Sequence, residues 1–166
     1  MTIFNPIIAV LQWLNDTQLA QSIRDSVWLF PAIETIHVIA IVIVVGAITR
    51  LDLRLAGLVW RDRPVTDVSG EMLPWTWISF VVATIFGLLL FASKPLTYLG
   101  IAFFDVKMAL IILAGANMLF FQYVTFRRVA EWDREPIPSA AVRIAGSLSL
   151  AFWVSVVVCG RLIGFV

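Results

Sequence analysis

Glu34 and His37 are the residues best able to do chemistry within an otherwise apolar stretch, residues 27–49. They are three positions apart, so on a helix their side chains project from the same face. His37 is the only histidine of the chain. An ionisable residue inside a membrane span is costly, and it usually faces a bundle interior, a cavity or a ligand. The pair therefore predicts a functional site, in which Glu34 needs His37, Arg161 or a proton as its partner.

A histidine in a helical membrane bundle can be a haem ligand, a metal ligand, a proton carrier or a buried structural residue. Haem b needs an axial ligand, an apolar slot and cations for its propionates. If the site holds a metal, His37 is the candidate ligand, to the iron of haem. The candidate cofactor-binding residues share polar, charged or sulfur-containing side chains: His37, Glu34, Lys94, Lys107, Arg161, Asn117 and Met118. The sequence assigns no catalytic residue.

The second iron ligand is open, because a chain with one histidine cannot ligate iron through two of its own. Met118 could supply a sulfur, a second copy of the chain could lend its own His37, or the iron could stay five-coordinate. Copper would need more soft or imidazole donors than one histidine and scattered methionines provide.

Simpler explanations exist for each of these residues. Long basic side chains near helix ends can snorkel to lipid headgroups, which would account for Lys94, Lys107 and Arg161 one at a time. Asn117 can form an interhelical hydrogen bond. His37 can be a hydrogen-bonded interior residue. The residues alone leave the structural, ligand and proton-carrier interpretations of His37 open.

The composition is that of an integral membrane protein in contact with the lipid bilayer. Of the 166 residues, 61% are hydrophobic and 14% are charged, whereas a soluble domain averages about 45–50% apolar and about 25% charged residues. The net charge of +1 gives no indication of a nucleic-acid partner. The lone Cys159 excludes an intrachain disulfide and makes a cysteine-based metal cluster implausible.

Four stretches are long and apolar enough to cross a bilayer, which takes about 20 residues. They cover about residues 27–49, 74–92, 100–122 and 140–165, and Pro74 is expected to open the second. Short connections and the lack of a linker predict one domain, residues 1–166. The predicted fold is all-α: an integral membrane four-helix bundle with a short N-terminal interfacial helix.

The N-terminal helix is predicted from Asn5 and Pro6, which resemble an N-cap and a first helical position. The apolar run at residues 7–14 is too short to span, and we therefore expect it to lie at the interface.

Basic residues near the helix ends predict the orientation. Eight lie in the first and third loops: Arg50, Arg54, Arg61, Arg63, Arg127, Arg128, Arg134 and Arg143. Four lie on the other side: Arg24, Lys94, Lys107 and Arg161. The first and third loops are thus expected in the cytoplasm and both termini outside. This places the embedded charged residues in the outer half.

Two stretches resemble known membrane families. ETIHVIAIVIVVGAITRLDLRL resembles the first core helix of the copper-resistance D proteins and of the membrane-bound, oxygen-independent protoporphyrinogen oxidases of bacteria. FFDVKMALIILAGAN resembles their third-helix pattern. The whole chain is also similar to an uncharacterised bacterial family of small four-helix inner-membrane proteins. The resemblance implies an inner-membrane location and a haem slot, with His37 matching the haem-ligating histidine and Lys107 the functional lysine. The oxidases carry a further histidine late in helix three, where this chain has Asn117 and Met118.

The leading hypothesis is a membrane protein whose His37-centred outer-half pocket binds haem b, for electron transfer or a membrane redox step. A redox partner protein or a homo-oligomer would complete it. The alternatives are a non-enzymatic transport or assembly protein, for copper, a proton or a small metabolite, and a structural subunit of a respiratory complex.

Overall fold

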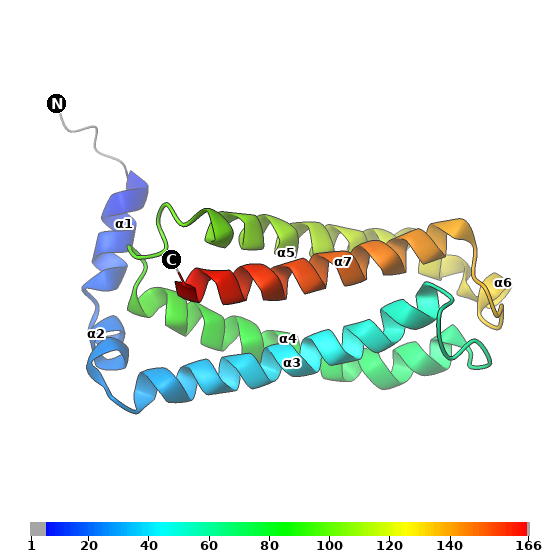
Figure 1. The fold of residues 1–166 in the computed structure, drawn as a ribbon, viewed down its shortest axis with the longest axis horizontal. Helices are drawn as coiled ribbons and strands as arrows, with labels where there is room; N and C mark the ends of the chain where they lie inside the picture. Colours follow the sequence, from blue (N-terminus) through cyan, green and yellow to red (C-terminus); the bar gives the residue numbers. More distant parts are fainter. Residues whose placement is uncertain (1–5, 166) are drawn as a thin grey trace. The chain divides into compact units, whose positions relative to one another are not determined.

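The structure, a computed structural model, describes residues 6–165, and all its regular elements are helical (Figure 1). The α-helices are α1 (Pro6–Asn15), α2 (Gln18–Asp25), α3 (Leu29–Leu55), α4 (Val65–Ser93), α5 (Ala102–Phe120), α6 (Val129–Trp132) and α7 (Ala140–Leu162). A π-helical turn (Phe121–Thr125) and 3-10 turns (Phe126–Arg128, Ile163–Phe165) complete them. Asn5, the predicted N-cap, lies outside the described residues.

Within the described part, four helical stretches have the length and apolar composition to cross a membrane. They are Leu29–Leu55, Val65–Ser93, Ala102–Trp132 and Ala140–Phe165. Many large apolar side chains along them are exposed, among them Val42, Ile78 and Ile112, and a bilayer rather than water would cover such a surface. The predicted all-α class, with four long apolar helices and a short N-terminal helix, is confirmed.

The chain divides into two compact units, and we describe each by itself. The first unit comprises Met1–Val42 with Ser79–Ile101, and the second comprises Ile43–Ile78 with Ala102–Val166. The first therefore holds α1, α2 and parts of α3 and α4, and the second holds the other parts of α3 and α4 with α5, α6 and α7.

In the first unit, a second N-terminal helix, α2, follows the predicted one. The Thr17 hydroxyl accepts a hydrogen bond from the Ala20 backbone N–H at 3.2 Å and so caps α2. Arg24 donates to the Asn15 side chain at 3.0 Å and to the Ser93 carbonyl at 2.8 Å. This guanidinium thereby ties α1 and α2 to the end of α4.

Helices α3 and α4 extend beyond the predicted spans, and Pro74 lies inside α4 rather than at its start. At 27 residues, α3 is about 40 Å long, whereas the hydrocarbon core is about 30 Å thick. The predicted bounds of α3 mark its apolar part, and the helix continues into a polar segment. In α4, Pro74 removes only the backbone hydrogen bond to Gly70, and the helix continues through it.

The start of α4 is set by a residue from the third loop. The Asp133 carboxylate accepts hydrogen bonds from the Thr66 backbone N–H and hydroxyl, both at 2.8 Å, and its carbonyl accepts one from the Val65 N–H at 3.0 Å. These bonds satisfy donors that a helix N-terminus leaves unpaired, and the carboxylate suits the positive end of the helix dipole. The first and third loops of the second unit are thus joined.

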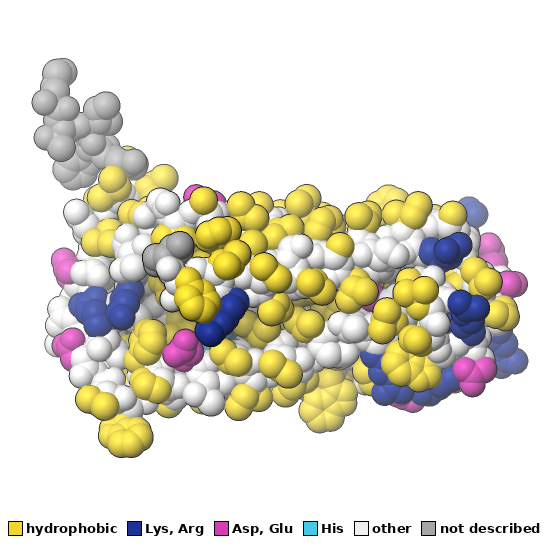
Figure 2. All heavy atoms as spheres, in the orientation of Figure 1, with side chains coloured by type: hydrophobic (Ala, Val, Ile, Leu, Met, Phe, Trp, Pro, Cys, Tyr) yellow, Lys and Arg dark blue, Asp and Glu magenta, His cyan; other side chains and the backbone are white. Residues whose placement is uncertain are grey.

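Arg54 strengthens the same junction from the end of α3. Its side chain is fully buried, and it donates to the carbonyls of Arg63 at 2.8 Å and Glu135 at 3.0 Å. Beside it lies the core of this end of the unit, formed by Leu55, Val65 and Val142. Figure 2 shows basic side chains gathered where α6 lies, whereas the Arg54 side chain is fully buried and holds the loops through its hydrogen bonds.

Helices α3 and α7 are in close contact at Gly146. A Cβ atom there would lie 2.8 Å from Leu55 Cβ and 2.9 Å from the Asp52 carbonyl oxygen. Real Cβ atoms do not come this close to their neighbours, so only glycine fits at this crossing.

Gly146→Ala should therefore lower the melting temperature of the detergent-purified protein, with an overpacking cost of about 1–3 kcal/mol. Gly115→Ala is the matched control, because a Cβ at Gly115 has no heavy atom within 4 Å. Thermal unfolding followed by circular dichroism compares the two variants. Equal melting temperatures would contradict the close crossing.

Candidate functional site

His37 lies on the part of α3 that belongs to the first unit, and its ring contacts α4. It is half-buried and lies on the same face of α3 as the buried residues Ile33 and Ala40, four positions before it and three after it. His37 Nδ1 is 2.7 Å from the Ala83 carbonyl oxygen. A carbonyl can only accept, so Nδ1 carries the hydrogen and donates it. A neutral His37 ring therefore has its lone pair on Nε2.

Gly87 holds the ring against α4, one turn beyond Ala83. A Cβ atom at Gly87 would lie 2.8 Å from His37 Cε1 and 3.3 Å from Nδ1. The imidazole thus occupies the space that any other residue at position 87 would fill. The hydrogen bond and this backbone contact together fix the position and the tautomer of the only histidine.

The other predicted residues of the first unit, Glu34 and Lys94, lie near aromatic side chains. Lys94 is exposed, and its amine lies 5.0 Å from the centre of the Phe30 ring, a cation–π contact. Glu34 is exposed and lies near Tyr98. Burial raises the pKa of the Tyr98 phenol, and the negative charge of Glu34 raises it further.

The remaining predicted residues belong to the second unit. Asn117 of α5 donates to the Ala145 carbonyl of α7 at 3.0 Å, which confirms the expected interhelical hydrogen bond. Lys107 is half-buried, and its amine lies 3.5 Å from where a Cβ of Gly160 would be.

Arg161 and Met118, the other two predicted residues in this unit, are placed differently. Arg161 is exposed, with its guanidinium 4.8 Å from the centre of the Phe165 ring, and Met118 is half-buried on α5. The seven predicted residues thus divide between the units, Glu34, His37 and Lys94 in the first and the other four in the second.

A metal site with several protein ligands is not formed by residues 6–165. No group of three or more His, Cys, Asp or Glu side chains in this part could hold a metal ion. A cofactor that brings its own equatorial ligands, as haem does, requires only one or two ligands from the protein. His37, with its fixed tautomer, fits that requirement.

The polar cluster around Arg54 was not identified as a structural centre by sequence reasoning. From the sequence alone, its basic residues indicate only which side of the membrane the loops face. Arg50 forms an ion pair with Glu71 at 3.2 Å, Arg63 pairs with the same carboxylate, and Asp52 is buried. Glu71 raises the pKa of the Arg63 guanidinium through its hydrogen bond and its charge. The one local signal is the segment RLDLRL at 50–55, in which oppositely charged residues follow directly on the apolar part of the helix.

Because the chain has one histidine, ¹⁵N-histidine labelling reports the His37 ring alone. At a pH where the ring is neutral, we expect the spectrum to show a protonated Nδ1 and an unprotonated Nε2. Gly87→Ala should displace the ring and lower the population of the Nδ1-protonated tautomer, whereas Gly115→Ala should leave the spectrum unchanged. A wild-type ring protonated on Nε2 alone would contradict the hydrogen bond to Ala83.

The proximity of Glu34 and Tyr98 gives a pH-dependent prediction. Glu34→Gln removes a negative charge that disfavours the phenolate, so the pKa of Tyr98 should fall, while burial keeps it above the ordinary value. Ultraviolet absorbance of the phenolate follows the titration. Tyr98→Phe identifies the signal, since Tyr123 is the only other tyrosine. If the pKa of Tyr98 is unchanged in Glu34→Gln, the two side chains do not lie close together.

Comparison with known proteins places the chain among proteins without an assigned activity. No curated protein and no solved structure matches it. A family model described as "Family of unknown function (DUF6644)" matches residues 28–166, which include all four long apolar helices. The chain belongs to this family of unknown function, DUF6644.

Proposed function

We propose that this membrane protein binds haem b through His37 and serves in electron transfer or another redox step in the membrane. The observation that carries the proposal is the hydrogen bond from His37 Nδ1 to the Ala83 carbonyl. Histidines that ligate a metal almost always donate their other ring N–H to a carbonyl, carboxylate or water, which fixes the tautomer and raises the basicity of the ligating nitrogen. His37 has this arrangement.

The residues of the first unit supply other requirements of a haem ligand site. Gly87 fixes the imidazole against α4, so Nε2 has one preferred direction. Lys94, in the same unit, is an exposed cation of the kind that pairs with a propionate. When bound, haem supplies a one-electron iron couple, whose potential depends on axial ligand, hydrogen bonding and burial.

A second ligand to the iron is open, because the chain has no second histidine. The candidates are His37 of a second copy of the chain or no further protein ligand. A homo-oligomer would supply the second histidine. A redox partner protein would deliver or accept the electron.

The resemblance to the protoporphyrinogen oxidases and copper-resistance D proteins supports the same role for His37. It covers the helix-one stretch around His37 and the helix-three stretch around Lys107. Lys107, half-buried against Gly160, would act within the second unit. We propose the bacterial inner membrane as the location.

We further propose that the first and third loops face the cytoplasm and that both termini lie outside. The eight arginines of these loops carry this orientation. The hydrogen bonds of Asp133 and Arg54 between the two loops support their lying on one side of the membrane.

Absorbance spectra of the detergent-purified protein, oxidised and reduced, test the proposal. With adequate haem supply we expect a Soret band in the wild type. His37→Gln should lose it, although a glutamine amide can still donate to Ala83 and preserve the helix contact. In His37→Gly, added imidazole should restore the band.

Two results would overturn haem binding at His37. One is a wild-type protein with no Soret band even after reconstitution with haemin. The other is a His37→Gln variant that retains full haem while its circular dichroism matches the wild type. Gly115→Ala is the control for expression and handling, because it changes a helix position with no neighbour within 4 Å.

A further inference from the structure

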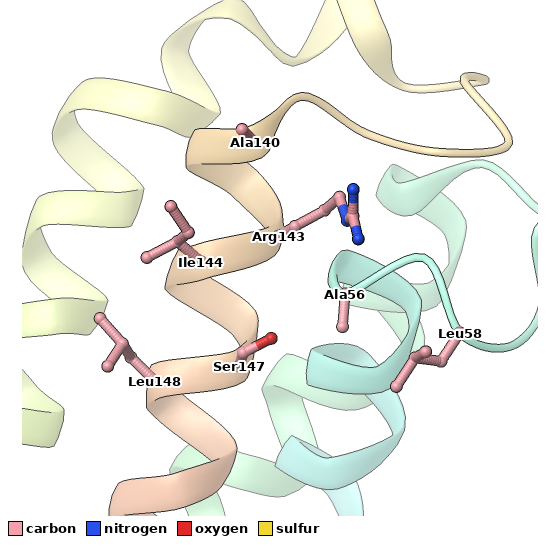
Figure 3. A pocket seen from close by; sticks show the side chains of 7 residues that line it. All are labelled: Ala56, Leu58, Ala140, Arg143, Ile144, Ser147 and Leu148. Carbon is pink, nitrogen blue, oxygen red and sulfur yellow. The ribbon is translucent and has the colours of Figure 1, made fainter.

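A groove of about 530 Å³ lies in the second unit between the end of α3 and the first turns of α7 (Figure 3). Its lining includes Ala56 and Leu58 from the α3 end, and Arg143, Ile144, Ser147 and Leu148 from α7. Its volume is within the range of small-molecule binding sites, about 300–1,000 Å³. His37 is not among the residues that line the groove.

The walls of the groove are apolar and exposed. Leu58 is 61% exposed, Ile144 58% and Leu148 44%. Figure 3 shows Ala56 and Leu58 on the side of α7 that carries Arg143 and Ser147, whereas Ile144 and Leu148 project from the other side of α7. Since α7 is one of the helices able to cross a membrane, a bilayer would cover its exposed apolar side chains, Ile144 and Leu148 among them.

The charge of the groove comes from one residue, Arg143. In Figure 3 its guanidinium and the Ser147 hydroxyl are directed from α7 toward the end of α3. Among residues 6–165 Arg143 takes part in no ion pair, and no acidic side chain lines the groove. The cation is therefore available to an anion beside an apolar surface.

Two neighbouring features favour an anion at the same place. Arg143 lies in the first turn of α7, where unpaired backbone N–H groups and the helix dipole favour negative charge. Arg61 is held beside the groove, because its Nε donates to the Gly57 carbonyl at 2.6 Å, next to Leu58. A ligand with a phosphate near Arg143 and an acyl chain along Ala56 and Leu58 matches this arrangement.

We propose that this groove binds an anionic phospholipid, with its phosphate on Arg143 and Ser147 and an acyl chain against the apolar wall. A basic pocket between transmembrane helices recognises anionic headgroups in this way. A zwitterionic lipid would fill the same apolar surface without a net charge to match Arg143. A soluble phosphate would lack the acyl chain that Ala56 and Leu58 accommodate.

Native mass spectrometry of the delipidated full chain, titrated with phosphatidylglycerol, tests the site. Arg143→Gln should weaken binding about fivefold, the effect of one basic residue near a membrane surface. Arg127→Gln is the matched control, because it removes the same charge from an exposed arginine outside the groove, and we expect less than a twofold change. Ser147→Phe fills the groove from an exposed position and should weaken binding without altering charge.

The source of the phosphate is tested with phosphatidylcholine of the same acyl chains and with inorganic phosphate. We expect weaker binding of phosphatidylcholine, insensitive to Arg143→Gln, and no competition by inorganic phosphate. Equal losses in Arg143→Gln and Arg127→Gln would overturn the site, because they indicate diffuse surface charge. Unchanged binding in a folded Ser147→Phe variant, or equal affinity for both lipids, would also overturn it.

Discussion

In apolar surroundings a polar side chain has to find its hydrogen-bond partner within the chain, and this requirement accounts for the polar contacts between helices in both units. His37 donates to the Ala83 carbonyl, and Asn117 donates to the Ala145 carbonyl. Both partners are backbone carbonyls of alanines, which have a second lone pair beyond the one used inside the helix. Small residues at these positions allow the donor side chain to reach the carbonyl.

Two glycines allow neighbouring helices to approach each other closely. Gly87 admits the His37 ring and Gly146 admits the backbone of α3, whereas Gly46 and Gly115 have no heavy atom within 4 Å of a built Cβ. In a bilayer, apolar side chains gain little by leaving lipid for protein, so helices associate through close packing and hydrogen bonds. This explains why many large apolar side chains of these helices remain on the surface.

Hydropathy predicted the four long helices because the apolar composition of each is a local property. It could not predict the start of α4 at Val65, which depends on Asp133, more than sixty positions away. Pro74 predicted a helix start, because proline favours the first position of a helix. The hydrogen bonds of Asp133 instead start α4 at Val65, and the helix continues through Pro74. Helix α2 has too little apolar character to be found by hydropathy, and its capping residue Thr17 was the available signal.

The sequence draws attention to His37 but does not predict the contacts of its ring. His37 is easy to find in the sequence, because it is the only histidine and lies among apolar residues. Its partner, the Ala83 carbonyl, is a backbone group that no side-chain pattern reveals. Arg54 looked like an ordinary loop cation, although it is fully buried and holds two loops together, because burial depends on the third loop folding over it.

Addition of haemin to the ¹⁵N-histidine-labelled protein tests the central claim most directly, since one imidazole gives the whole signal. If His37 Nε2 ligates haem iron, stoichiometric haemin should shift or broaden the His37 ring resonances beyond detection, and Gly115→Ala should behave identically. His37 resonances that stay unchanged at saturating haemin, with Nδ1 still bonded to Ala83, would contradict the account.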